Sequence, residues 1–153
     1  MKFETKAIRT QTDRSQHREH STPIFPTSSF VFDNAEQMRA IFASEEEGNI
    51  YSRFTNPNFK ELEDKIAALE GTDDAVVLAS GMSAVFGSFM AFLKAGDHLL
   101  ASRAIFGSTY QVTLNWLPRW GITCTFLDPS DINSWETHVQ ANTKMLYLET
   151  SLT

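Results

Sequence analysis

Apolar residues in the second half of the chain follow helix spacing and strand spacing in turn. Asn56 and Pro57 form a helix start with proline in its first turn, and apolar side chains then recur at helical spacing up to Gly71. Residues 75–79 form a continuous apolar run, which is typical of a strand buried on both faces of a parallel sheet. The pattern continues with predicted helices at about residues 82–94, 109–120 and 134–141, and with predicted strands at residues 98–101, 122–127 and 145–148.

This alternation of strands and helices with short connections predicts an open parallel α/β sheet with right-handed crossovers. Pro118 lies near the end of the helix at residues 109–120, which we expect to be frayed or kinked there. The sequence ends directly after the strand at residues 145–148, on the side where such sheets place their ligand sites. That strand would be an uncovered edge with no following helix. We therefore expect the 153 residues to be a fragment of a longer protein.

The first fifty residues show no such alternation. Residues 10–22 are polar, and Pro23 and Pro26 fix an extended segment. Asp33 or Asn34 is placed to cap a short helix whose apolar positions lie on one face. A segment of this kind cannot bury itself, so it is expected to lie on another surface.

These patterns divide the chain into two parts. We expect residues 1–55 to be an N-terminal arm that contacts a neighbouring subunit. Residues 56–153 are expected to form an incomplete α/β domain.

Composition and charge exclude several classes of function. The chain is 42% hydrophobic and 21% charged, as in soluble globular proteins, and its net charge of −6 provides no basic surface for nucleic acid. The longest apolar stretch, residues 85–93, is about half a membrane span. The N-terminus lacks a signal peptide, and the single cysteine, Cys124, fits a reducing compartment. We expect a soluble, cytoplasmic protein with no membrane or nucleic-acid partner.

His17 and His20 have no cysteine or paired carboxylate nearby, so no metal site is expected.

The clearest candidate chemistry follows the apolar run at residues 75–79. Ser80, Gly81 and Met82 lie where a strand turns tightly into a helix, and the free N–H groups of a helix start suit a phosphate monoester. Neither a Gly-x-Gly-x-x-Gly fingerprint nor a P-loop is present. An ordinary tight turn would explain the same residues.

A second candidate is the pair Tyr51 and Arg53. A guanidinium presents paired donors that match phosphate oxygens, and a phenol adds one more. The two side chains face the same side if the segment is extended, because they are two residues apart. An exposed surface pair is the alternative interpretation.

Taken together with Thr55-Asn56-Pro57, these two motifs closely resemble the Cys/Met-metabolism family of pyridoxal-phosphate (PLP) enzymes, the trans-sulfuration enzymes. Further segments match the family pattern in order: Thr22-Pro23-Ile24, Leu69-Glu70-Gly71, Leu93-Lys94-Ala95-Gly96-Asp97-His98 and Leu148-Glu149-Thr150. The resemblance implies the large PLP-binding domain of the aspartate-aminotransferase-like fold, fold type I, of which this chain would be the truncated N-terminal part.

The resemblance also implies how the cofactor pyridoxal 5'-phosphate would be bound. Gly81 and Met82 would hold its phosphate through backbone N–H groups. Tyr51 and Arg53 would reach the phosphate of the neighbouring subunit's cofactor, which makes the complete protein a homo-oligomer, a dimer or a tetramer. Glu149 would lie beside the cofactor, although a capping or ion-paired surface carboxylate is the alternative.

Position 106 is where the resemblance implies a ring stacked on the cofactor's pyridine. Most members of the family have tyrosine there, whereas this chain has Phe106. Phenylalanine keeps the stacking but lacks the phenol as an acid–base group. Within the family this favours the O-succinylhomoserine sulfhydrylase branch over the lyases.

The sequence departs from the family pattern after Thr150, where Ser151-Leu152-Thr153 replaces Pro-Ser/Thr-Asn-Pro. A frameshift or a mis-joined end would produce this departure. The catalytic residues of the family, above all its Schiff-base lysine, are expected beyond the chain end. None of the lysines present can be assigned that role. They are Lys2, Lys6, Lys60, Lys65, Lys94 and Lys144.

The implied parent reaction is γ-replacement on an O-acyl-homoserine. Sulfide or a thiol replaces the acyloxy group, which leaves as a carboxylate, and sulfide gives homocysteine, a step of methionine biosynthesis. Alternatives within the family are cystathionine γ-synthase and methionine γ-lyase. Two other hypotheses concern the chain as it stands: a truncated, non-catalytic fragment, or a phosphate-binding α/β module without imine chemistry.

Overall fold

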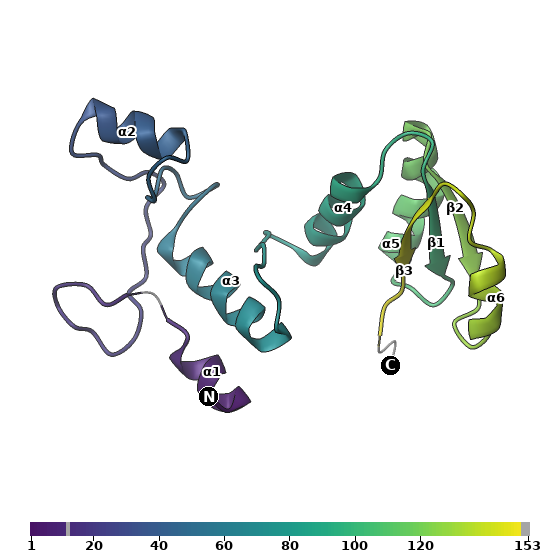
Figure 1. Ribbon diagram of the computed structural model, residues 1–153, viewed down its shortest axis with the longest axis horizontal. Coiled ribbons are helices and arrows are strands. Elements are labelled where there is room, and N and C mark those ends of the chain that lie inside the picture. The colour runs from purple at the N-terminus through teal and green to yellow at the C-terminus, as the bar shows by residue number, and fades with distance from the viewer. Residues whose placement is uncertain (12, 151–153) are drawn as a thin grey trace. The chain divides into compact units, whose positions relative to one another are not determined.

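A computed structural model describes residues 1–11 and 13–150 of the chain (Figure 1). The chain divides into two compact units, Met1–Val77 and Leu78–Thr153. The departure from the family pattern at residues 151–153 lies outside the described residues. None of the helices in the described part of the chain is long and apolar enough to cross a membrane.

The described residues of the first unit form three helices, α1 (Phe3–Arg9), α2 (Ala35–Phe42) and α3 (Pro57–Glu70). Their ends follow the local signals in the sequence. The Asn34 side chain caps α2 by accepting from the Gln37 N–H at 2.9 Å, and the Asn56 side chain caps α3 by accepting from the Asn58 N–H at 2.9 Å. Gly71 ends α3 with a φ of 72°, which glycine adopts without strain. The predictions of α2 and α3 are therefore confirmed.

Helix α1 was not predicted, because residues 3–9 lack an apolar stripe that would mark a helix. None of its residues is buried, and it packs against α3. The Lys6 ammonium donates to the Ala68 carbonyl at 3.4 Å. A contact between segments this far apart in the sequence is not visible in local spacing.

The second unit contains a parallel sheet of three strands, β1 (His98–Ser102), β2 (Thr123–Leu127) and β3 (Thr143–Tyr147), in the order β2-β1-β3. Figure 1 shows β1 between the other two strands. Helix α4 (Gly81–Phe92) precedes β1, and α6 (Ile132–Thr137) connects β2 to β3. The predicted α/β class with a parallel sheet is confirmed.

The connection from β1 to β2 is a composite helix rather than the regular one predicted for residues 109–120. It begins as α5 (Gly107–Gln111), continues as the π-helical turn η1 (Val112–Trp116) and ends as the 3-10 turn η2 (Leu117–Trp120). Pro118 lies in η2, where its ring and missing N–H prevent regular helix. The predicted irregularity at Pro118 is confirmed, whereas the π-helical turn was not anticipated.

The predicted strand at residues 75–79 is wrong for the described chain, where these residues form no strand. A strand requires a neighbour for its backbone N–H and C=O groups. β1 already has a neighbour on both sides. The N–H groups of Ala75 and Val77 bond instead to the carboxylates of Asp74 and Glu63, at 2.9 and 3.0 Å. The apolar side chains alone therefore do not make this run a strand.

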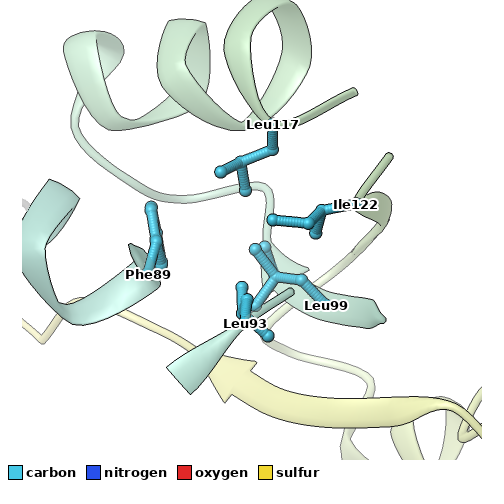
Figure 2. Close-up of a cluster of buried hydrophobic side chains, with 6 residues drawn as sticks. Phe89, Leu93, Leu99, Leu117 and Ile122 are labelled. Carbon is cyan, nitrogen blue, oxygen red and sulfur yellow. The ribbon is translucent and has the colours of Figure 1, made fainter. Parts of the chain in front are cut away.

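The apolar core of the second unit lies between α4, the composite helix and β1. Figure 2 shows Phe89, Leu117 and Ile122 pointing toward one another beside Leu93 and Leu99. All five residues of β1 are buried. Cys124 in β2 packs against this core, and burial raises the pKa of its thiol to about 12.

His98 connects the three strands at the start of the sheet. Its Nδ1 lies 2.8 Å from the Thr143 hydroxyl in β3, and its Nε2 lies 3.0 Å from the Thr125 hydroxyl in β2. The side chain is buried, and this burial lowers its pKa below the ordinary value of 6.5. The imidazole is therefore neutral in the folded chain at neutral pH.

This buried imidazole makes stability depend on pH. Above pH 6.5 the neutral form is present in both the folded and the unfolded chain, so His98 adds no pH dependence. As the pH falls below 6.5, the unfolded chain binds a proton that the folded chain resists, and the free energy of unfolding decreases. We expect urea denaturation between pH 7.5 and pH 5 to show this loss. His98→Gln should remove it, at a cost of about 1–3 kcal/mol at pH 7.5.

The exposed His20 provides the control, because His20→Gln should keep the pH dependence of the unmodified chain. Equal slopes for His98→Gln and the unmodified chain would contradict the assignment.

Candidate functional site

The candidate site lies at the carboxyl ends of β1 and β3, in the loops that follow these strands. Phe106 precedes the first residue of α5 after β1, and Glu149 follows β3 by two residues. The two strands run parallel, with His98 aligned to Thr143 and Ala101 to Tyr147. This register brings the two loops to the same edge of the sheet.

The turn before α4 has the form expected of an anion site. The extended residue Ser80 caps the helix, and its hydroxyl accepts from the Ser83 N–H at 3.1 Å. The N–H groups of Gly81 and Met82 have no carbonyl partner within the helix because they lie in its first turn. Apart from its chain neighbours and the backbone of its own helix, a Cβ placed on Gly81 would meet no atom within 4 Å in the described chain. The turn therefore offers free donors, open space and the positive end of a helix dipole to an anion.

A hydrogen-bond network surrounds Glu149. Its Oε2 accepts from the Phe106 N–H at 2.6 Å, and its Oε1 accepts from the Thr109 hydroxyl at 3.0 Å and the Tyr147 hydroxyl at 2.8 Å. We call Glu149, Phe106, Thr109 and Tyr147 the Glu149 network. It joins the loop after β3 to the start of α5.

The network changes the ionisation of its own members. Burial tends to raise the pKa of the Glu149 carboxyl, but the hydrogen bonds from Phe106, Tyr147 and Thr109 outweigh burial and lower this pKa below its ordinary value. Burial, together with the hydrogen bond to Glu149, raises the pKa of Tyr147 to about 12. At neutral pH the pair is therefore a carboxylate and a neutral phenol.

The Phe106 ring is available to a ligand. Its side chain is 55% exposed, and no other aromatic ring contacts it in residues 1–11 and 13–150. An exposed planar ring offers a stacking surface to a flat ligand.

Tyr51 and Arg53 lie in the first unit and contact each other. Tyr51 forms an antiparallel bridge with Ser29, and the chain then turns, with the Phe54 N–H donating to the Tyr51 carbonyl at 2.7 Å. The segment is thus a turn and not the extended stretch that the two-residue spacing assumed. The Arg53 guanidinium nevertheless lies 4.1 Å from the centre of the Tyr51 ring and donates to its hydroxyl at 3.0 Å.

The Arg53 charge has no carboxylate partner in the described part of the chain. A guanidinium without an ion pair, held beside a phenol, keeps its paired donors for an external anion.

The structure accounts for the predicted residues in two groups. Phe106 and Glu149 are hydrogen-bonded, and Met82 is linked to them through Thr109, whose hydroxyl lies 4.0 Å from the Met82 sulfur. Tyr51 and Arg53 form the second group, in the other unit. The roles assigned to all these residues stay predictions.

Two residues of the site were missed by sequence reasoning. Tyr147 precedes Glu149 by two residues, so strand alternation points both side chains to the same side of the chain. This spacing could have identified Tyr147. Thr109 has no exposed surface, and nothing in its local pattern distinguishes it from other threonines.

Comparisons with known proteins place this site in a family context. The family model described as Cys/Met metabolism PLP-dependent enzyme matches residues 4–152. An O-succinylhomoserine sulfhydrylase from Pseudomonas aeruginosa is 43% identical over 147 residues, which are 96% of this chain and 36% of that protein. An L-methionine gamma-lyase from Fusobacterium nucleatum subsp. polymorphum is 41% identical over 146 residues, which are 95% of this chain and 37% of that protein.

A solved structure shows the same fold. The crystal structure of an O-acetylhomoserine (thiol)-lyase from Campylobacter jejuni, which contains N'-pyridoxyl-lysine-5'-monophosphate, matches 98% of this chain with a TM-score of 0.91 and 32% identity. The match covers 37% of that protein. The chain thus spans little more than a third of the length of these relatives.

The cap at Ser80 generates a prediction about the turn itself. Ser80→Ala removes the acceptor for the Ser83 N–H, so we expect the free energy of unfolding in urea to decrease by about 1 kcal/mol. Ser88→Ala is the matched control, because Ser88 lies exposed in the middle of the same helix, where alanine is well tolerated. Its effect should stay within about 0.5 kcal/mol. Equal effects at both positions would show that Ser80 does not act as a cap.

Proposed function

This chain belongs to the Cys/Met metabolism PLP-dependent enzymes, because the family model matches nearly its whole length, and we propose that it forms the part of such an enzyme that binds the cofactor phosphate and ring. The observation that carries the proposal is the Ser80-capped turn, with free N–H groups and open space at Gly81. The turn precedes a helix whose first residues connect through Thr109 to Phe106 and Glu149.

The residues present fit pyridoxal 5'-phosphate. The N–H groups of Gly81 and Met82 would hold the phosphate, as the free donors of a helix start do. Tyr51 and Arg53 would add a phenol and a guanidinium to the phosphate of a neighbouring subunit's cofactor, which supports a dimer or a tetramer. The absence of an ion pair to Arg53 within the described chain supports this role.

Phe106 and Glu149 would define the place of the cofactor ring. Phe106 would stack on the pyridine with its exposed ring, and Glu149 would lie beside it. Phe106 can neither donate nor accept a proton, so acid–base work falls to other groups. The bound cofactor supplies an electron sink for carbanion chemistry. We propose that the lysine that forms its imine comes from the part of the relatives' length that this chain does not span.

The reaction that we propose for the whole enzyme is γ-replacement on O-succinyl-homoserine. Sulfide displaces succinate from Cγ, and homocysteine forms for methionine biosynthesis; a thiol in place of sulfide would give the corresponding thioether. Phe106 supports this branch, since the family resemblance implies tyrosine at this position in most members and favours the sulfhydrylase branch where phenylalanine replaces it. Methionine γ-lyase and cystathionine γ-synthase are the alternatives, and the similar identities to a sulfhydrylase and a lyase, 43% and 41%, keep the lyase in consideration.

Two hypotheses remain for the 153-residue chain by itself. A non-catalytic fragment would form no borohydride-reducible PLP adduct at a lysine. A phosphate-binding module would bind the cofactor's phosphate without imine chemistry. A reducible adduct at one lysine of the chain would contradict both.

Phosphate recognition can be measured by equilibrium dialysis. We expect the chain to bind pyridoxal 5'-phosphate at least about tenfold more tightly than pyridoxal, because charge-assisted hydrogen bonds contribute about 1.5–3 kcal/mol. Arg53→Gln should reduce this preference about tenfold. Arg9→Gln, at an exposed position of α1, should leave it unchanged. Equal affinities for pyridoxal and its phosphate would contradict the proposed site.

The proposed reaction is tested on the whole enzyme, with the part that this chain does not span, reconstituted with pyridoxal 5'-phosphate. We expect homocysteine from O-succinyl-L-homoserine and sulfide at a higher rate than methanethiol from L-methionine. Phe106→Tyr keeps the stacking ring and adds a phenol, so it should raise methionine cleavage relative to sulfhydrylation by about tenfold or more. Cleavage of methionine without any use of O-succinyl-homoserine would reject the sulfhydrylase branch.

A further inference from the structure

The Glu149 carboxylate is occupied by donors of its own chain. A carboxylate has about four acceptor positions, and three are used by the Phe106 N–H, the Thr109 hydroxyl and the Tyr147 hydroxyl, all within 3.0 Å. Little capacity is left for a ligand. The residue is therefore better suited to hold its neighbours than to contact the cofactor.

The neighbours that it holds lie at the start of α5 and at the end of β3. Thr109 has no exposed surface and a single hydroxyl hydrogen, which it donates to Glu149 at 3.0 Å. The same hydroxyl lies 4.0 Å from the sulfur of Met82 in the first turn of α4. The ring of Tyr147 meets Phe89 of α4 edge-on, with 5.0 Å between ring centres. The Glu149 network thus contacts α4 at two points and α5 at its start.

Phe106 depends on this network for its position. Its ring is 55% exposed and has no aromatic partner in the described chain, so no ring contact holds it. Its backbone is held at residue 106, where the N–H donates to Glu149 at 2.6 Å.

We propose that Glu149 is a positioning residue, which sets the Phe106 ring at the right height and angle above the turn at Gly81 and Met82. This inference rests on the proposed function, in which that turn holds a phosphate and that ring stacks on a pyridine. Thr109 shares the role, since its hydroxyl connects the carboxylate to α4. A direct contact between Glu149 and the cofactor, as the family resemblance implied, is the competing interpretation.

The two interpretations differ in what Thr109 does. Glu149→Gln, Thr109→Val and Thr109→Ser are compared by binding of pyridoxamine 5'-phosphate, which cannot form an imine with lysine. A positioning role predicts that Glu149→Gln and Thr109→Val both weaken this binding about tenfold, since small displacements of an oriented group have large effects. Thr109→Ser keeps the hydroxyl and should bind pyridoxamine 5'-phosphate as tightly as the unmodified chain. If Thr109→Val binds as the unmodified chain does, Glu149 does not act through this network.

Two further measurements separate positioning from a general loss of structure. Inorganic phosphate should bind all variants equally, because none of the substituted residues is among its proposed donors, which are the first turn of α4 and the Tyr51 and Arg53 side chains. The urea midpoint of Thr109→Ser should match that of the unmodified chain. Glu136→Gln, an exposed exchange in α6, is the control and should leave all readouts unchanged. A parallel loss of phosphate binding in Thr109→Val would overturn the positioning role.

The backbone contact is tested without any cofactor. In the unmodified chain the NMR signal of the Phe106 amide should shift as Glu149 is protonated, with a midpoint below the ordinary pKa of glutamate. Glu149→Gln should abolish this titration and Glu136→Gln should keep it. Failure of the unmodified chain to bind pyridoxamine 5'-phosphate would contradict the proposed function. If the Phe106 amide signal does not shift as the pH is lowered, the positioning role of Glu149 is overturned, whether or not pyridoxamine 5'-phosphate binds.

Discussion

The parallel pairing of β1 with β3 is the constraint on which the candidate site depends. Phe106 follows β1, and Glu149 follows β3, more than forty residues later. Only the parallel register, with Ala101 opposite Tyr147, brings the two loops to one edge of the sheet. The register is held by the complete burial of β1 and, at the other end of the strands, by His98 between Thr125 and Thr143. The packing that buries β1 therefore also determines the geometry of the candidate site.

The sequence predicted features that depend on neighbouring residues. Asn34, Asn56 and Gly71 act at helix ends through their own side chains or backbone freedom, so a short window of sequence suffices to assign them. Family motifs pointed to Gly81, Met82, Phe106 and Glu149 as residues of one site. In the structure Thr109 contacts Met82 and Glu149, and Glu149 accepts from Phe106.

Features that depend on distant partners were not predictable in the same way. Residues 75–79 have the composition of a buried strand, but a strand also requires a neighbour, and composition does not show whether one is present. Thr109 is important only because Glu149 and Met82 meet it from other elements. The spacing of Tyr51 and Arg53 predicted that their side chains are neighbours, and in the structure they are in contact. A turn, and not the extended segment that was expected, brings them together.

The apolar run at residues 75–79 affects how the chain behaves in a concentrated solution. Val76 is 77% exposed and Leu78 is 47% exposed, and no strand pairs with their backbone in the described chain. Exposed segments of high β propensity readily add to the edges of other sheets, and the outer edges of β2 and β3 are such edges. Self-association through this segment would compete with folding as the concentration rises. This exposed apolar run is thus an aggregation hazard during synthesis and purification.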